Sequence, residues 1–192
     1  MRLKDFAVVI SGYTFREAIE ADENGNSFVF QAKDVRQANP FYDITVLTKI
    51  TQNLSSDSNN LKKNDIIQVA RGMKTGSFRS TVFVSEEENI IASSSVHIIR
   101  LTAKDVLPEY VSYYLNSKLG QDCLSKIISG SYIGAVPRKE LENINIPIPS
   151  INYQQAIIDL FKNMREQQKI IDRKSAINKN ILNSAFRTLV TK

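Results

Sequence analysis

The sequence is poor in the residues that cross-link small domains. Its 192 residues contain one cysteine, Cys123, and one histidine, His97. A disulfide within the chain needs two cysteines, and a structural zinc site needs four cysteine or histidine ligands, so both are excluded. We therefore expect no metal and no cofactor.

Long apolar runs are also missing. No run approaches the roughly 20 apolar residues of a membrane-spanning helix, and the N-terminus lacks the apolar stretch and cleavage site of a signal peptide. We therefore expect a cytoplasmic protein. Hydrophobic residues make up 42% of the sequence and charged residues 23%, which is typical of a globular chain. The length allows one domain with an appendage rather than two full domains.

The excess positive charge lies near the C-terminus. Residues 1–161 contain 17 Lys and Arg against 18 Asp and Glu, whereas residues 162–192 contain 8 against 2. Such a segment attracts phosphate backbones or acidic partners, but a basic helix face is also commonly a plain solvated surface. Charge alone therefore favours nucleic acid only weakly.

The first 149 residues predict a mixed, strand-rich domain of the α+β class. Short runs rich in Val, Ile, Phe and Thr alternate with polar turns. Helical spacing begins at Pro108 and ends near Gly130, and residues 141–149 alternate as a last edge strand before Pro149. The other candidate strands are residues 6–10, 27–31, 44–50, 65–70, 78–84, 90–92 and 95–101.

Residues 150–192 predict one long C-terminal α-helix, because they contain neither proline nor glycine and their apolar residues recur at heptad spacing. About 40 helical residues would span ~60 Å, more than a small domain can cover. A helix folded back on its own domain is the alternative, but we expect an antiparallel coiled coil between two copies. Gln168, Ser175 and Asn178 also fall on the stripe, where they would weaken the pairing and fix its register. The expected dimerisation residues are Ile157, Phe161, Met164, Ile171, Leu182, Ala185 and Leu189.

Nothing in the sequence predicts a catalytic site. Asn39-Pro40-Phe41-Tyr42 approximates the Asn-Pro-Pro-Tyr loop with which amino-methyltransferases hold a flipped base, but the second proline is missing. None of the 7 glycines forms the glycine-rich turn that a nucleotide-like cofactor needs. His97 alternates along a predicted strand, and Cys123 falls in an apolar helix, so we interpret both as structural.

Two loops have the composition of nucleic-acid contacts. Residues 71–81 carry three cations, no acid, two glycines and several hydroxyls, and residues 129–139 repeat this pattern. Arg and Lys pair with phosphates or guanine edges, and Ser, Thr and Tyr add short hydrogen bonds. Loops of this kind are also common on protein surfaces, so each is weak evidence by itself. The candidate DNA-binding residues here are Arg71, Lys74, Thr75, Ser77, Arg79, Ser131, Tyr132, Arg138 and Lys139.

The order of motifs resembles the family of type I restriction-modification specificity subunits. Ser11-Gly12-Tyr13-Thr14 is similar to the turn that opens their recognition domains, and residues 61–72 are similar to their central pattern of basic turn, Asp, apolar strand and Arg-Gly. Tyr114-Leu115-Asn116-Ser117, a glycine loop and Ile-Pro-Ile-Pro before Gln154 match the most diagnostic part. Asn152-Tyr153 and the late Gly76 depart from the pattern. Typical members carry two recognition domains and two helices, so this chain resembles a half-length subunit.

The resemblance implies a non-catalytic subunit whose recognition domain, residues 1–149, reads one half of a bipartite DNA target. Residues 150–192 would be the spacer and dimerisation helix, and Ser11, Tyr13 and Thr14 would contact DNA. The implied partners are double-stranded DNA, a second copy of the chain, methyltransferase subunits and restriction subunits. Two other hypotheses stay open: an orphan or antirestriction module that only binds methylase subunits, and a small DNA methyltransferase.

Overall fold

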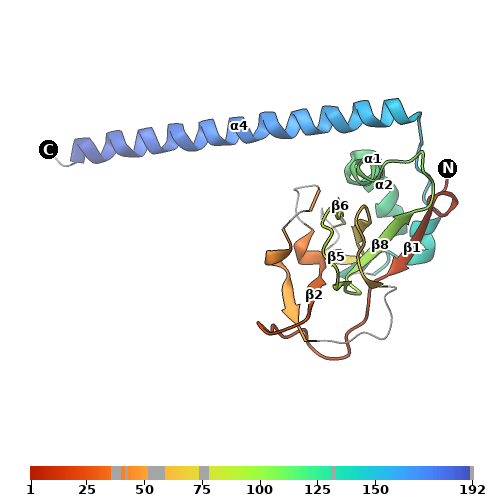
Figure 1. Ribbon diagram of the computed structural model, residues 1–192. Helices are drawn as coiled ribbons and strands as arrows, with labels where there is room; N and C mark the ends of the chain where they lie inside the picture. Colours follow the sequence, from red (N-terminus) through yellow and green to blue (C-terminus); the bar gives the residue numbers. More distant parts are fainter. Residues whose placement is uncertain (36–39, 42, 52–58, 74–77, 131–132, 191–192) are drawn as a thin grey trace. The chain divides into compact units, whose positions relative to one another are not determined.

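The computed structural model describes residues 1–35, 40–41, 43–51, 59–73, 78–130 and 133–190, with side chains up to residue 187 (Figure 1). The chain falls into two compact units, Met1–Gln154 and Gln155–Lys192. All strands of the described residues lie in the first unit, and the described part of the second is α-helix. The predicted α+β class, with a strand-rich part before one long C-terminal helix, is confirmed.

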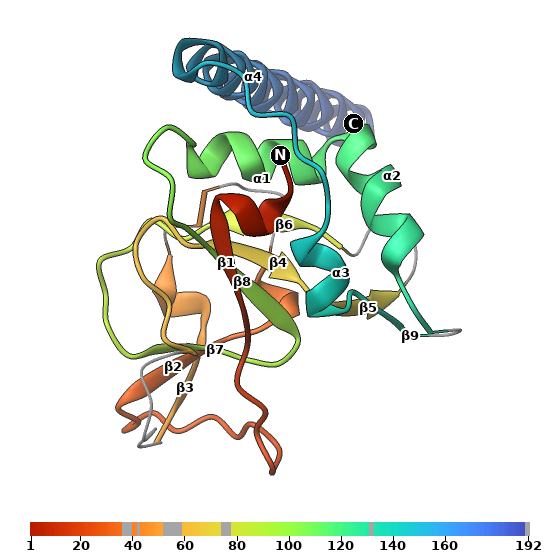
Figure 2. The ribbon, with the colours of Figure 1, turned by 90° about the vertical axis from the view of Figure 1, so that its right-hand side faces the viewer.

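A four-stranded antiparallel sheet forms the centre of the first unit. Its order is β1 (Ala7–Ser11), β8 (Val96–Leu101), β4 (Ile66–Val69) and β6 (Ser80–Val82). All four residues of β4 are buried, because α1 (Pro108–Asn116) packs on β4 and β6. Figure 2 shows α1 along one side of this sheet and α3 (Arg138–Glu142) beside β1. The sheet thus holds the core that positions the surrounding loops.

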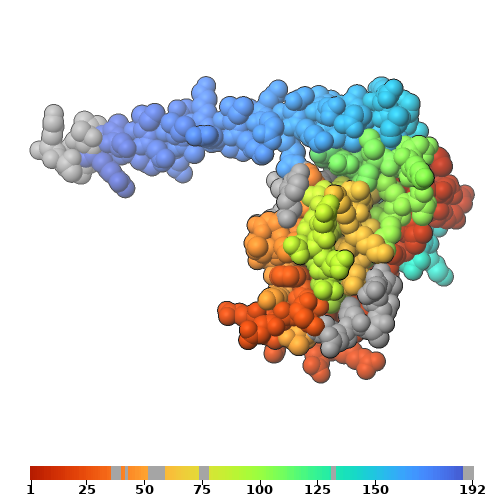
Figure 3. All heavy atoms as spheres, viewed as in Figure 1, coloured from red at the N-terminus to blue at the C-terminus, as the bar shows by residue number. Residues whose placement is uncertain are grey.

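A second, three-stranded sheet has the order β3 (Thr48–Ile50), β2 (Ser27–Phe30) and β7 (Ile90–Ala92). Figures 1 and 2 place it at the opposite end of the unit from α1, and Figure 3 shows orange segments of the chain at that end. The strand predicted over residues 44–50 is wrong in its first half, where Ile44–Val46 form a 3-10 helix, η3. The Asp43 carboxylate accepts the Thr45 N–H at 3.0 Å and starts this turn. Two further 3-10 helices are η1 (Leu3–Asp5) and η2 (Ala32–Asp34).

The single helical segment predicted from Pro108 toward Gly130 is broken at Ser117 into α1 and α2 (Lys118–Ile127). The Ser117 hydroxyl accepts the Gly120 N–H at 3.2 Å and donates to the Tyr114 carbonyl at 2.6 Å. Gly120 allows the close approach, since a Cβ at this position would lie 2.1 Å from the Tyr114 oxygen. The chain turns again at Gly130, whose φ of 101° suits glycine.

The edge strand predicted over residues 141–149 is also wrong at its start, because Leu141 and Glu142 belong to α3. The following residues lie beside the N-terminus: Leu3 N–H donates to the Ile144 carbonyl at 2.9 Å, and Ile146 N–H donates to the Met1 carbonyl at 2.8 Å. Two prolines then follow, and they have no N–H to continue a ladder.

The long helix α4 (Ile151–Val190) begins on a fully buried amide, Gln154. Its Oε1 accepts the Leu107 N–H, and its Nε2 donates to the carbonyls of Asp105 and Pro149, each at 2.9 Å. Because one side chain meets three backbone groups, the first turn of α4 is fixed to the first unit. No helix in the described chain is long and apolar enough to cross a membrane.

The side chains predicted to form a dimer stripe on α4 are largely in solvent. Met164, Ile171, Leu182 and Ala185 are exposed, Ile157 and Phe161 are half-buried, and the side chain of Leu189 lies outside the described residues. Three other large apolar residues, Ile170, Ile177 and Ile181, are also exposed. At about 100° per residue they lie roughly 100° to 140° around the helix from the centre of the stripe. The helix therefore has apolar residues on two sides.

Candidate nucleic-acid interface

A two-stranded antiparallel ribbon joins the two segments predicted as nucleic-acid loops. Its strands are β5 (Arg71–Met73) and β9 (Ile133–Ala135), and Arg71 pairs with Ala135, Gly72 with Gly134, and Met73 with Ile133. The prediction of plain loops at these residues is therefore wrong. Residues 71–73 and 133–135 are distant in sequence, and the ribbon places them side by side.

The ribbon has a glycine face and a side-chain face. Directly paired residues point to the same side of a ribbon, so Gly72 and Gly134 share one face. That face lies against the domain, because a Cβ on Gly134 would be 2.8 Å from Ile128 Cγ2 and 3.0 Å from Phe78 Cζ. The ribbon can pack this closely because Gly134 lacks a side chain. Its outer face presents exposed Arg71, Met73 and Ile133.

His97 lies where the sheet, the ribbon and α3 meet, and its predicted place in a strand is confirmed. Its Nε2 is 2.8 Å from the Val136 carbonyl, and burial lowers the pKa of His97 below its usual value. The Val136 hydrogen bond and the negative charge of Glu142 raise this pKa, while the positive charges of Arg138 and Arg71 lower it further. We therefore assign a neutral ring that donates from Nε2, between two cations from distant parts of the sequence.

Three predicted DNA-binding residues lie near this histidine, and a fourth, Lys139, follows one of them on α3. Ser11 is the register partner of His97 at the end of β1, Arg71 begins β5, and Arg138 and Lys139 begin α3. All four are exposed, and Arg138 Nε forms an ion pair with Glu142 at 2.7 Å. We call Ser11, Arg71, Arg138 and Lys139 the cationic surface.

The other predicted site residues have different surroundings. Arg79 is half-buried and Thr14 is exposed. Five more residues that we predicted to bind DNA lie outside the described residues: Lys74, Thr75, Ser77, Ser131 and Tyr132.

The methyltransferase-like tetrapeptide lies partly outside the described residues, which include Pro40 and Phe41 but not Asn39 or Tyr42. The Phe41 ring is buried and packs on Phe30 and Phe83, with ring centroids 4.8 and 6.4 Å away. It therefore belongs to the apolar core. In the described part of the chain, no group of three or more His, Cys, Asp or Glu side chains is placed to hold a metal ion.

The sequence matches the type I restriction modification DNA specificity domain over residues 1–183. The chain belongs to this family. The resemblance inferred from the motifs is confirmed. A search of curated proteins gives no significant match.

Solved structures share the specificity-domain fold. The S subunit of a type I restriction-modification system from M. genitalium is 16% identical, with a TM-score of 0.59 over 88% of this chain and 39% of that one. The HsdS subunit from Thermoanaerobacter tengcongensis is 19% identical, with a TM-score of 0.61 over 90% and 38%. A structure described for complex assembly and conformational transition of the type I R-M system is 19% identical, with a TM-score of 0.67 over 91% and 40%. This chain therefore spans about 40% of the length of those proteins.

The opening motif of the specificity domain, Ser11-Gly12-Tyr13-Thr14, is held close to the second sheet. A Cβ on Gly12 would lie 2.0 Å from the Ser93 oxygen, so only glycine fits. The half-buried Tyr13 ring meets Phe15 edge-on at 4.9 Å and packs against Val29, Ile50 and Ile91. The motif thus fixes the backbone that leaves β1.

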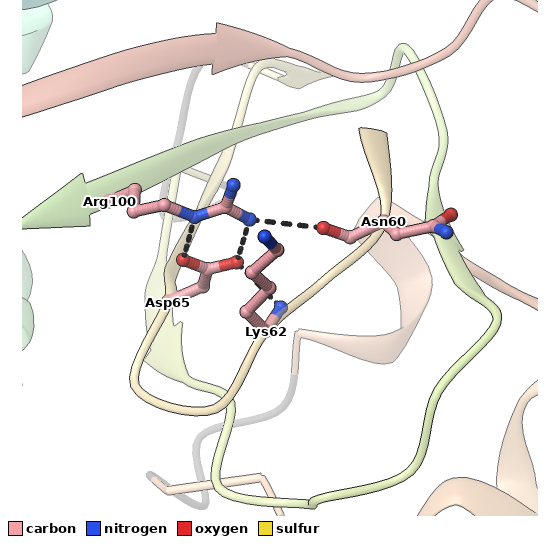
Figure 4. Close-up of polar contacts among 4 residues, drawn as sticks. All are labelled: Asn60, Lys62, Asp65 and Arg100. Atoms are coloured by element: carbon pink, nitrogen blue, oxygen red, sulfur yellow. Dashed lines mark hydrogen bonds and ion pairs between the residues drawn. The ribbon is translucent and has the colours of Figure 1, made fainter. Parts of the chain in front are cut away.

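The central motif of the specificity domain contains a buried ion pair that sequence reasoning missed (Figure 4). The Asp65 side chain is 2% exposed and receives Arg100 Nε at 2.8 Å and Nη2 at 2.6 Å. Asp65 also accepts the Lys62 N–H at 2.7 Å, and Arg100 Nη2 donates to the Asn60 carbonyl at 3.0 Å. The hydrogen bond with Asp65 raises the pKa of Arg100. Asp65 therefore organises the turn before β4, and the only signal in the sequence was an Asp after two lysines.

Proposed function

We propose that this chain is a DNA-binding specificity subunit of a type I restriction-modification enzyme and reads one half of a bipartite target. The observation that carries the proposal is the cationic surface in a specificity-domain fold. Exposed Arg71 and Arg138 come from two distant segments and lie near a neutral histidine that is the register partner of Ser11, and exposed Lys139 follows Arg138 on α3. Guanidinium and ammonium groups in this arrangement suit phosphates and guanine edges. The subunit is non-catalytic and acts in the cytoplasm.

Residues 1–149 are proposed as the target recognition domain and residues 150–192 as the spacer and dimerisation helix. The contacts proposed beyond the cationic surface come from the opening turn and from the two segments that the ribbon joins. These residues are Tyr13, Thr14, Lys74, Thr75, Ser77, Arg79, Ser131 and Tyr132.

We infer that the two apolar sides of α4 serve two kinds of partner. The stripe that includes Met164, Ile171 and Leu182 pairs with a second copy in an antiparallel coiled coil. Ile170, Ile177 and Ile181, on the other side, dock a methyltransferase subunit. Restriction subunits join the same scaffold in the complete enzyme.

Methylome sequencing tests the function directly. A host that carries this chain should show a methylated bipartite motif, and deletion of the gene should abolish methylation at that motif alone. Restoring the gene should bring the same motif back. An unchanged methylome after deletion would favour an interaction-only module. S-adenosylmethionine binding by the isolated chain would favour a methyltransferase.

Alanine substitutions test the cationic surface within the assembled complex. Loss of a phosphate contact at Arg71, Arg138 or Lys139 should weaken binding about equally across sequences and lower the salt slope by roughly one unit. Loss of a base contact should instead reduce the discrimination between bases at one target position by about 1 to 3 kcal/mol. Titration of duplex DNA at several salt concentrations measures both. Lys63→Ala is the matched control, since Lys63 is also a partly exposed cation but lies in the turn before β4, outside the cationic surface. Unchanged affinity and specificity in all three variants would show that DNA binds another face.

A further inference from the structure

Two large apolar side chains lie next to each other on the outer face of the β5–β9 ribbon. Met73 is 64% exposed and Ile133 is 62% exposed, and they are register partners. Side chains of directly paired residues lie about 5 Å apart at Cβ, so the two form one apolar patch.

The patch is not needed to hold the ribbon on the domain. The opposite, glycine face makes that contact, with Phe78 and Ile128 closing on Gly134. Exposed apolar side chains that do not contribute to the core commonly mark a binding surface.

The surroundings of the patch point to nucleic acid. Arg71 lies two residues before Met73 on the same strand and therefore on the same face. Arg138 also lies near His97, where it forms an ion pair with Glu142. A cation beside a patch on a two-stranded ribbon fits the major groove, which is about 12 Å wide and is lined by phosphates.

The major groove presents one apolar group for such a patch. Among the four base-pair arrangements, only thymine carries a methyl group there, at C5. We propose that Met73 and Ile133 contact the C5-methyl group of a thymine in the half-site. This inference rests on the proposed DNA-reading function, and it adds the chemistry by which one base is chosen.

Uracil substitution tests the contact without changing base pairing. The probe is a duplex with the methylated motif, in which each thymine of the half-site is replaced in turn by uracil. With the chain assembled with its methyltransferase subunits, one position should bind about three- to five-fold more weakly with uracil, as expected for one buried methyl group. In Met73→Gln and Ile133→Thr, this difference between thymine and uracil should shrink toward zero.

Val8→Thr is the matched control, because Val8 is 48% exposed on β1 and the change has the same β-branched geometry as Ile133→Thr. It should keep the preference for thymine. The inference is overturned if uracil is tolerated at every position while DNA still binds, if the half-site contains no thymine, or if both ribbon variants keep the full preference. It is also overturned if those variants lose assembly with the methyltransferase subunits. Absence of any DNA binding by the wild-type complex would instead overturn the proposed function.

Discussion

Arg100→Met should lower the free energy of unfolding of the first unit by about 3 to 5 kcal/mol. The substitution leaves the Asp65 carboxylate buried, at 2% exposure, with the Lys62 N–H as the remaining donor of the contacts described above. It also removes the bond to the Asn60 carbonyl. Urea unfolding followed by tyrosine fluorescence measures the loss. All 7 tyrosines precede residue 155 and the chain has no tryptophan, so the signal reports on the first unit of the intact protein.

Two further variants test whether the buried carboxylate without its ion-pair partner causes the loss of stability. Asp65→Leu combined with Arg100→Met removes the buried charge as well, and it should be more stable than Arg100→Met alone. Glu86→Gln removes an ion pair of exposed side chains, that of Lys63 and Glu86, and it should change stability little. If Arg100→Met is no more harmful than Glu86→Gln, the buried pair does not fix the turn before β4.

The full chain should form a dimer through α4 that Ile171→Glu combined with Leu182→Glu converts to a monomer. Two carboxylates per chain would be buried without partners, which should raise the dissociation constant about 100-fold or more. Both positions are exposed in the single chain, so the substitutions leave its own fold intact. Light scattering at micromolar concentration measures the change.

Ile177→Glu is the control for that experiment, because it places the same charge on the other side of the same helix. It should leave the dimer intact and weaken only the binding of methyltransferase subunits. A monomeric wild-type chain, or a dimer that survives the double substitution, contradicts the proposed pairing.

A two-fold dimer also constrains the DNA. Two identical readers related by a two-fold axis must meet the same half-site in inverted orientation, so the methylated motif should be an interrupted palindrome. The 40 residues of α4 span about 60 Å, which limits the distance between the two recognition domains to about 17 base pairs. An asymmetric motif would contradict the homodimer and indicate pairing with a different specificity chain.

The regular elements could be predicted from the sequence where apolar residues follow a clear period. Residues 90–92 form β7 as predicted, and residues 66–69 and 80–82 lie within their predicted runs. The ribbon could not be predicted, because each strand has three residues with glycine at its centre and shows no alternation. Its pairing joins residues about 60 positions apart, and that contact exists only once the core has formed.

The candidate site, too, could be predicted only in part from the sequence. Composition identified Arg71, Arg138 and Lys139 as cations of acid-poor loops, but the approach of Arg71 and Arg138 to His97 depends on strand pairing and on α3. On α4, the heptad frame selected one stripe and passed over Ile177, because that frame assigns a single apolar seam to a helix. The ion pair of Asp65 with Arg100 links the turn before β4 to β8, and no local pattern in the sequence predicts such a pair.

The amide of Gln154 has a consequence for exchanging parts between specificity subunits. Its three backbone partners are Asp105, Leu107 and Pro149, so Gln154 and these partners come from one parent only when a crossover falls outside residues 105–154. A crossover at Pro149 would replace Gln154 with the residue that the helix of the other subunit has at this position. Beyond Gln154 the described chain is one uninterrupted helix. A crossover there would join the genes of two specificity subunits, and the recognition domain would keep its own contacts with Gln154.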